Sequence, residues 1–496
     1  MSKLEEFIKN EGHAFPGKTY AEELLMPVFN DQRDYLFHVM FDIHRAHVIM
    51  LAEKGIIPEE EAKTMLEGIN KVAMSDTGSI SYQPQFEDLF FMMEAKIGEV
   101  IGDELAGKIH IARSRNDMGI AMYRLVLREH LLQLLGSAYQ LSEALLEQAE
   151  EHNETYITGY THTQPAQPTT LGHYLLAVYD VLQRDIKRLW AAYKTVNKSS
   201  LGAAALTTTG FPICRDRTRD LLGFEGIIEN SYDSIAGADY LLETSSALMT
   251  CMVNTGRWIQ DFLQHVTREF GTFQVADPYV QVSSIMPQKR NPVSIEHSRS
   301  IASSAYGEAY AAMNMVHNTP FGDIVDTEDD VQPHLYRSFT NANRVLKLMY
   351  AVIATLKVNK DHAKEMAKKS CITITELADT LARDYSIPFR KAHSIASYIS
   401  KQTVKEQKEL CDWKVEDVNE VIRGYVPVSL TEEEWKKIIS PEYFVQIRSL
   451  QGGPNPDEVS RMIKDRNETL TGDLLSYEGT VRGLKEKREN LINFRF

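Results

Sequence analysis

A stretch rich in polar side chains, residues 281–297 (QVSSIMPQKRNPVSIEH), has the residue types that acid–base chemistry requires. Pro287 and Pro292 each remove a backbone donor and clash with the preceding turn, so no helix continues through them. We therefore predict a loop held by neighbouring helices, a common location for reactive groups. Hydroxyls, a cation and an amide suit a site that accepts a proton and binds an anion, whereas the alternative is a surface loop. The candidates are Ser283, Ser284, Lys289, Asn291 and Glu296.

A second polar string, residues 110–117 (HIARSRND), lies directly before a long segment with apolar residues at helical spacing. Its two arginines, beside a serine and an asparagine, suit the bidentate capture of a carboxylate. Ser114, Asn116 and Asp117 are also good helix-capping residues, so an ordinary N-terminal cap is the alternative. The spacing leaves both interpretations open.

A third string, residues 159–168 (GYTHTQPAQP), places His162 between two threonines in a segment bounded by prolines. An imidazole titrates near neutral pH and can act as a general acid or base, although a lone histidine is more often structural. Glu296 could orient such a histidine, as carboxylates do in other acid–base pairs. Its alternative role is that of a first-turn glutamate stabilised by the helix dipole.

Long helices must position these strings, because apolar residues recur at helical spacing over much of the chain while strand and hairpin signals are scarce. Four or five such helices with broad apolar faces predict a bundle. Faces wider than one chain covers also predict association of subunits. The segments expected to be helical are 28–54, a helix that starts at Pro58, 118–152, 172–197, 238–270 and 298–316.

The domain organisation follows from length and from the change in pattern along the chain. A chain of 496 residues is too long for one compact core, so two or three domains are expected. Helices become shorter after about residue 360, which indicates a smaller C-terminal unit. We predict an all-α protein with an N-terminal helical domain over 1–112, a central bundle over 113–360 and a C-terminal helical domain over 361–496.

Composition and charge restrict the possible partners. A net charge of −15 and a pI of about 5.5 disfavour contact with the phosphate backbone of nucleic acids. Four dispersed cysteines without a Cys/His cluster indicate a reducing compartment and argue against a structural zinc site. Neither a signal peptide nor an apolar run of about eighteen residues is present. We therefore expect a cytoplasmic protein with no nucleic-acid or membrane partner.

Together the three strings resemble one family. SSIMPQKRNP is similar to the signature GSSxMPxKxNP of the aspartase/fumarase superfamily. HIARSRND and GYTHTQPAQP resemble HTGRSRND and GYTHLQRAQP of its argininosuccinate lyase branch, and the resemblance extends from about residue 25 to about residue 465. It implies an all-α fold in which four chains share one central bundle, so that each active site collects its three motifs from three subunits.

The resemblance also implies a reaction, the β-elimination of a succinyl group to fumarate, without a cofactor or a metal. Ser283 would be the base that removes a proton next to a carboxylate, and Lys289 would supply positive charge that helps to activate it. His162, oriented by Glu296, would protonate the leaving atom. The residues expected to hold the substrate carboxylates are Ser114, Arg115, Asn116, Thr161 and Asn291.

Departures from this branch concern the loop and the wall around the leaving group. Val282 replaces the glycine that precedes the first signature serine, and glycine gives a loop more conformational freedom. Asp31 and Gln32 stand where the branch reads FNAS, and the segment 319–330 (TPFGDIVDTEDD) lacks the tyrosine, glutamine and lysine that contact the substrate in the branch. The acids at 323–330 suit a cationic amine better than a further carboxylate.

The leading hypothesis is a carbon–nitrogen lyase that reversibly cleaves an N-substituted aspartate to fumarate and an amine. Argininosuccinate is the default substrate, and another N-succinyl amine, as in ethylenediamine-disuccinate lyases, is the main rival. Oxygen or lactone chemistry, as in fumarases or carboxymuconate cycloisomerases, is disfavoured by the strings at 110–117 and 159–168. A non-catalytic role, as in lens crystallins of this family, is disfavoured by the intact set of acid–base candidates.

Overall fold

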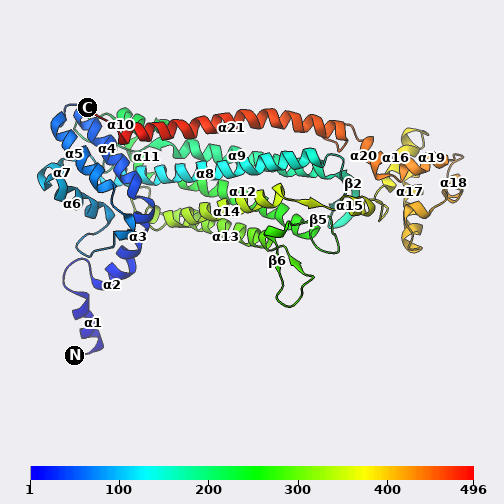
Figure 1. Ribbon diagram of the computed structural model, residues 1–496, viewed down its shortest axis with the longest axis horizontal. Coiled ribbons are helices and arrows are strands. Elements are labelled where there is room, and N and C mark those ends of the chain that lie inside the picture. The colour runs from blue at the N-terminus through cyan, green and yellow to red at the C-terminus, as the bar shows by residue number, and fades with distance from the viewer. Residues whose placement is uncertain (1) are drawn as a thin grey trace.

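The computed structural model describes residues 2–496 and shows an elongated, mostly helical molecule (Figure 1). Helices make up 67% of the chain and strands 5%, which confirms the predicted all-α class. Long helices run along the molecule, with N-terminal helices at one end and short C-terminal helices at the other (Figure 1). The long helices of the bundle are α8 (Arg115–Glu151), α9 (Leu171–Val196), α12 (Asp239–His265), α13 (Val293–Val316) and α14 (Gln332–Ala354).

The bundle forms because each long helix buries an apolar face against its neighbours. α8 packs against α9 and α14, α12 packs against α9 and α13, and α13 packs against α14. None of the helices in residues 2–496 is both long and apolar enough to cross a membrane. α13 comes close to its neighbours because the residues it buries are mostly small, among them Ala302, Ala305, Ala309 and Ala312.

The N-terminal helices share one continuous apolar core with the bundle. The helix predicted over 28–54 is present as two helices, α3 and α4, which meet at Leu36. Pro58 directly precedes α5, as predicted, because a proline at a helix start removes no helical hydrogen bond. The helices of this part are α1 (Lys3–Glu11), α2 (Lys18–Tyr20), the π-helical turn η1 (Ala21–Leu25), α3 (Met26–Tyr35), α4 (Phe37–Glu53), α5 (Glu59–Ala73), α6 (Leu89–Ile101) and α7 (Asp103–Lys108).

The C-terminal helices form a small unit with its own apolar core, built around Leu377, Ile395, Val418 and Trp435. The helices of this unit and its connection are α15 (Lys360–Met366), α16 (Ile374–Arg383), α17 (Phe389–Lys405), α18 (Val415–Arg423), α19 (Glu432–Ile438) and α20 (Pro441–Gln446). Two further short helices, α10 (Arg215–Leu222) and α11 (Ser231–Ala236), lie between α9 and α12 in the chain.

The last helix, α21 (Pro456–Ile492), does not belong to this small core. It turns back along α8 and ends beside α4 (Figure 1), and its buried residues are part of the bundle core. The predicted domain 361–496 therefore groups α21 with helices whose core it does not share. We propose instead that the C-terminal unit comprises residues 371–446 and that α21 belongs to the bundle.

Within residues 2–496, strands occur as four short pairs. The longest pair is an antiparallel hairpin in which Tyr156 lies opposite Thr170 and Thr161 lies opposite Gln164. The sequence did not predict this hairpin, because two prolines interrupt the pattern of its second strand; proline is tolerated on the open edge of a two-stranded ribbon. The pairs are β1 (Tyr156–Thr161) with β2 (Gln164–Thr170), β3 (Lys198–Ser199) with β4 (Gly226–Ile227), β5 (Phe273–Gln274) with β8 (Lys357–Val358), and β6 (Gln281–Val282) with β7 (Arg290–Asn291).

Gly172, the second residue of α9, lets the start of that helix pack closely against the end of α8. A Cβ atom on Gly172 would lie 2.5 Å from the carbonyl oxygen of Ala149 and 2.9 Å from Cα of Asn153. Both are backbone atoms and yield little, so we expect Gly172→Ala to lower the free energy of unfolding by about 1–3 kcal/mol. Gly472→Ala is the matched control at an exposed position of α21 with open space around it, and it should raise stability by about 0.5–1 kcal/mol. Thermal unfolding followed by circular dichroism measures both; equal shifts in the same direction would contradict the packing argument.

Candidate active site

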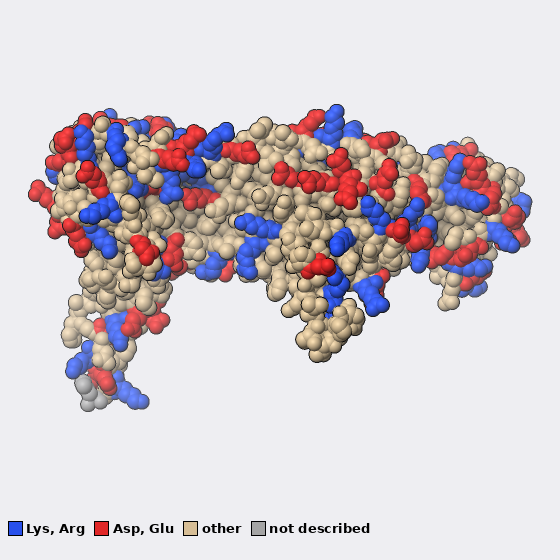
Figure 2. All heavy atoms as spheres, viewed as in Figure 1, with Lys and Arg blue, Asp and Glu red and all other residues tan. Residues whose placement is uncertain are grey.

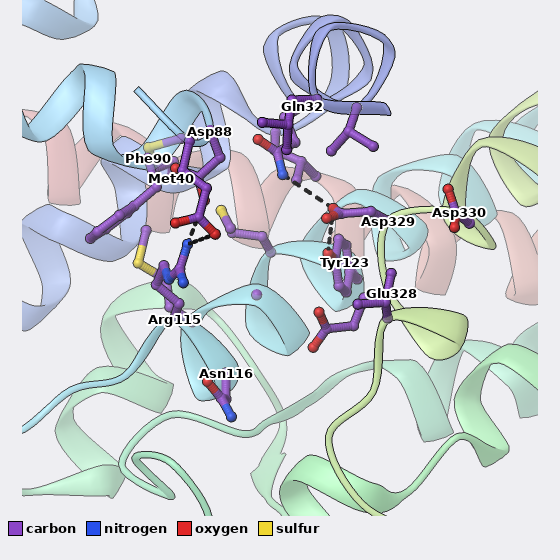
Figure 3. Close-up of a pocket in the computed structure, with 18 of the residues that line it drawn as sticks. Gln32, Met40, Asp88, Phe90, Arg115, Asn116, Tyr123, Glu328, Asp329 and Asp330 are labelled. Carbon is purple, nitrogen blue, oxygen red and sulfur yellow. Dashed lines mark hydrogen bonds and ion pairs between the residues drawn. The ribbon is translucent and has the colours of Figure 1, made fainter. Parts of the chain in front are cut away.

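A cavity of about 270 Å³ lies where the start of α8 meets the N-terminal helices and the segment 323–330. Arg115 and Asn116, two of the predicted carboxylate-binding residues, line it. Figure 3 shows their side chains on one side, beside Asp88, with Glu328 and Asp329 across from them. The string 110–117 therefore lies at a cavity of a size that suits a small molecule.

The start of α8 explains how this string is held. Ser114 is the N-terminal cap, with its hydroxyl accepting from the backbone N–H of Asn116 and its own N–H donating to Asp117 at 3.0 Å. Asp117 is fully buried and also accepts from the N–H groups of Gly202 (2.8 Å) and Ala204 (3.1 Å). Ser114 and Asp117 thus act as helix-capping residues. The side chains of the two residues between them, Arg115 and Asn116, face the cavity.

Arg115 is the only arginine or lysine among the described residues that line the cavity. Its Nη1 lies 2.9 Å from Oδ2 of Asp88 and 3.5 Å from Oε1 of Glu87, and its guanidinium lies over the ring of Phe91. Burial raises the pKa of Asp88 although Arg115 opposes that shift. The guanidinium has five N–H donors in a planar fork, so it can hold Asp88 and still present donors to a bound carboxylate.

The opposite wall consists of residues from the acidic segment 323–330. Asn116 donates from Nδ2 to Oδ2 of Asp323 at 2.7 Å. Asp329 accepts at 3.1 Å from Nε2 of Gln32 and at 3.1 Å from the hydroxyl of Tyr123. These bonds anchor the segment 323–330 to α3 and to α8.

Sequence analysis identified Gln32 and the acids of 323–330 as rebuilt positions but did not name Asp88 or Tyr123. Tyr123 follows Asn116 by seven residues, two helical turns, so both project from one face of α8; this spacing could have revealed it. Asp88 caps α6 by accepting from the N–H of Phe91 at 3.0 Å, and as a sequence feature it looks like an ordinary helix cap.

Thr161 and His162 lie at the tip of the β1–β2 hairpin and are exposed. His162 and the next residue have positive φ angles of 52° and 61°, which lets a two-residue turn reverse the chain. The hairpin lies at the end of the bundle far from the N-terminal helices (Figure 1), so the imidazole is remote from the cavity of its own chain.

The predicted loop is a hairpin that projects from the side of the bundle (Figures 1 and 2). Ser283, next to β6, accepts from the N–H of Met286 at 3.0 Å, and Lys289 is exposed beside β7. Asn291 ends β7 and is half-buried. Val282, Ile285 and Met286 are all exposed, with 82% of Ile285 accessible, which is unusual for apolar side chains.

The loop is shorter than predicted. α13 starts at Val293 instead of at residue 298, so residues 293–297 are helical and Glu296 lies exposed in the first turn. The reason is that Pro292 occupies the cap position, where its missing N–H costs no hydrogen bond. Pro292 thus marks the end of the loop and the start of α13. It does not prevent residues 293–297 from being helical.

One chain by itself brings together only part of the predicted site. Arg115 and Asn116 line the cavity, with Ser114 directly before them, but none of Ser283, His162, Lys289 and Glu296 lines it within the described residues 2–496. The three strings lie at three separate places along the bundle (Figure 1). In the same range no group of three or more His, Cys, Asp or Glu side chains is arranged to hold a metal ion, and the expected absence of metal and cofactor stays a prediction.

Comparison with known proteins gives two family matches. A family model described as "Lyase" matches residues 19–307, and one described as "Argininosuccinate lyase C-terminal" matches residues 371–446. Argininosuccinate lyase 2 of Agrobacterium fabrum is 40% identical over 448 residues, which cover 89% of this chain and 88% of that protein. Argininosuccinate lyase of Methanocaldococcus jannaschii is 36% identical, with 94% of both chains covered.

The fold is likewise close to a solved relative. An EDDS lyase variant with bound fumarate superposes with a TM-score of 0.85 at 31% identity, covering 92% of this chain and 91% of that one. The sequence matches extend over both the bundle and the small C-terminal unit, so they are not confined to one shared motif. The chain therefore belongs to the argininosuccinate lyase family of the aspartase/fumarase superfamily.

Proposed function

We propose that this chain is a carbon–nitrogen lyase that catalyses the reversible β-elimination of an N-substituted aspartate to fumarate and an amine. The observation that carries the proposal is 40% identity with an argininosuccinate lyase in a chain that places Arg115 and Asn116 at a cavity. The similarity to an EDDS lyase solved with fumarate supports the same product. Its partner is accordingly a small dicarboxylate substrate.

The proposed mechanism assigns each bond change to a residue. Ser283 removes a proton from the carbon next to a carboxylate, and the electron pair is first held as the dianion of that carboxylate. In the next step this electron pair forms the carbon–carbon double bond as the carbon–nitrogen bond breaks. The intermediate is doubly charged at that carboxylate, and Lys289 supplies the compensating positive charge. His162, oriented by Glu296, gives a proton to the departing nitrogen. The residues that hold the two carboxylates are Ser114, Arg115, Asn116, Thr161 and Asn291.

A homotetramer is the assembly that best reconciles this mechanism with the separation of the three strings. Other copies of the chain would have to supply the loop and the hairpin to the cavity formed by the start of α8. The exposed apolar residues of the loop support this proposal, as does a groove of about 770 Å³ on α9, α12 and α13, because such surfaces are usually covered by a partner. Residues lining that groove include Val178, Val253, Trp258 and Tyr306.

Two substrates are the first candidates for this chemistry. Argininosuccinate is suggested by the names of the curated relatives, and ethylenediamine-disuccinate by the structural similarity to EDDS lyase. The relatives do not favour fumarase-like or cycloisomerase-like chemistry, or a non-catalytic role. We also propose a cytoplasmic location, because the four cysteines are free and dispersed.

The proposal is tested by incubating the purified protein with fumarate and a panel of amines, and separately with argininosuccinate and ethylenediamine-disuccinate. We expect at least one N-substituted aspartate to form or decay, with the change in fumarate absorbance as the readout. A turnover number within the usual enzymatic range of about 1–1000 per second is expected for the correct pair. Absence of fumarate consumption or release with every compound, in a protein that is folded and assembled, would refute the lyase assignment.

A further inference from the structure

The cavity at the start of α8 has two chemically different walls. One wall is apolar and flexible, with two methionines from α8 and one from α4. The other wall carries the carboxylates of Asp323, Glu328 and Asp329. A ligand that fills this space needs an apolar segment and a group that complements negative charge. The apolar lining residues are Leu24, Leu25, Val28, Leu36, Met40, Phe90, Met118 and Met122.

Negative charge exceeds positive charge around this cavity. Arg115 is already paired with Asp88 and Glu87 on its own side, at 2.9 and 3.5 Å. The carboxylates across the cavity have neutral partners only: Asn116 for Asp323, and Gln32 with Tyr123 for Asp329. Neutral donors orient a carboxylate but leave its charge uncompensated, so a cation entering the cavity would gain from it.

The excess of negative charge in the cavity affects Glu328 most clearly. Burial, together with the neighbouring carboxyl of Asp323, raises the pKa of Glu328 to about 9. At neutral pH the side chain therefore keeps its proton while the cavity is empty, and a bound cation would favour its release. Figure 3 shows Glu328 extending from its segment toward α8. The charged and titratable groups facing Glu328 are Asp323, Asp329, Arg115, Tyr123 and Tyr240.

We propose that Asp323 and Glu328 form a subsite for a second positively charged group on the leaving amine. The substrate would then be the N-succinyl derivative of a diamine or of a guanidino-amine whose far end carries no carboxylate. This inference rests on the proposed lyase function and specifies its substrate class. The methylene chain of such an amine would lie against the methionine wall, while Arg115 and Asn116 hold the succinyl end.

The same wall argues against the two substrates named by the relatives. Argininosuccinate and ethylenediamine-disuccinate both carry a carboxylate on the part that leaves. Placed in this subsite, that carboxylate would face the carboxyl groups of Asp323, Glu328 and Asp329, which offer it no positive charge and repel it where they are ionised. Because acidic residues form this wall, the far end of the leaving amine should carry a positive charge instead of a carboxylate.

The test compares three amines of similar length in the addition direction with fumarate: diaminobutane with an amine at each end, butylamine, and γ-aminobutyrate. We expect kcat/KM for the diamine to exceed that for butylamine by on the order of 10–100-fold, with γ-aminobutyrate slowest. Glu328→Gln should remove most of this preference, measured as the ratio of kcat/KM for the diamine to kcat/KM for butylamine in the same variant. Asp326→Asn, an exposed neighbour that does not line the cavity, is the matched control and should keep the preference. Fastest addition of γ-aminobutyrate, or an unchanged preference in Glu328→Gln, would overturn the subsite.

A binding measurement separates failure of the subsite from failure of the lyase assignment. Calorimetry with diaminobutane in two buffers of different ionisation enthalpy reports protons released on binding. Because the pKa of Glu328 is about 9 in the empty cavity, binding near neutral pH should release up to one proton, and affinity should rise with pH up to about 9. Glu328→Gln should abolish the release. Binding with proton release but without turnover would refute only the lyase assignment, whereas absence of binding would refute the subsite.

Discussion

Ser283→Ala is expected to lower kcat by a factor of about 10²–10⁴, because it removes the proposed base while leaving the carboxylate-binding residues in place. Ser283 lies in a projecting loop, and the contacts it loses are the hydrogen bonds that it accepts from the N–H groups of Ile285 and Met286. The melting temperature should therefore stay within about a degree of the unaltered protein, as for most surface substitutions. Fumarate release from an N-substituted aspartate is the readout for activity.

The adjacent serine provides the control. Ser284 is exposed in the same loop and has the same side chain, so Ser284→Ala tests whether a hydroxyl anywhere in the loop is sufficient. Its kcat should fall by no more than a few-fold, and fumarate should bind both variants as well as it binds the unaltered protein. Full activity in Ser283→Ala, or an equal loss in both variants, would refute the assignment of the base.

Co-assembly of two inactive variants should restore activity if each site takes its parts from different chains. We expect Ser283→Ala and Asn116→Ala to be inactive separately and to regain about one quarter of the unaltered activity when mixed equally in one tetramer. The fraction follows because a site needs an intact loop from one chain and an intact α8 start from another, each present with a chance of about one half. Co-expression with two different affinity tags yields the mixed assemblies, and steady-state turnover measures the recovery.

A same-loop pair is the matched control for this experiment. Ser283 and Lys289 lie on one loop, so a mixture of Ser283→Ala with Lys289→Ala gives every site a loop that carries one of the two defects. No recovery is expected for this pair. Recovery in both mixtures would point to exchange of chains or contamination, and recovery in neither would refute sites shared between subunits.

The sequence predicted the long helices and their bundle, but it predicted neither the β1–β2 hairpin nor the path of α21. Apolar spacing and the positions of prolines placed α8, α9 and α12 within a few residues of their observed ends, because these signals are local. The β1–β2 hairpin was not predicted, since its pairing depends on contacts across a turn in a proline-containing stretch. The return of α21 along the bundle depends on contacts with residues hundreds of positions earlier, which no local pattern encodes.

The same contrast between local signals and tertiary contacts holds for the candidate site. The string 110–117 contains two residues that line the cavity, Arg115 and Asn116, and the negative charge of the acids at 323–330 by itself predicts a cationic partner. Asp88 and Tyr123 join them only through tertiary contacts: Asp88 caps another helix, and Tyr123 meets Asp329 across 206 positions. The separation of Ser283 and His162 from that cavity depends on the three-dimensional path of the bundle, which sequence spacing does not define.

The path of α21 also determines the order in which parts of the core can form during synthesis. Tyr477 donates to the carbonyl of Leu132 at 3.0 Å, and Arg488 pairs with Asp42 at 2.7 Å, so one late helix closes over segments made much earlier. While the ribosome is still producing the preceding residues, the strip of α8 and α4 beneath it remains uncovered and open to unwanted association. The core of the bundle is therefore complete only after residues 456–492 have been synthesised.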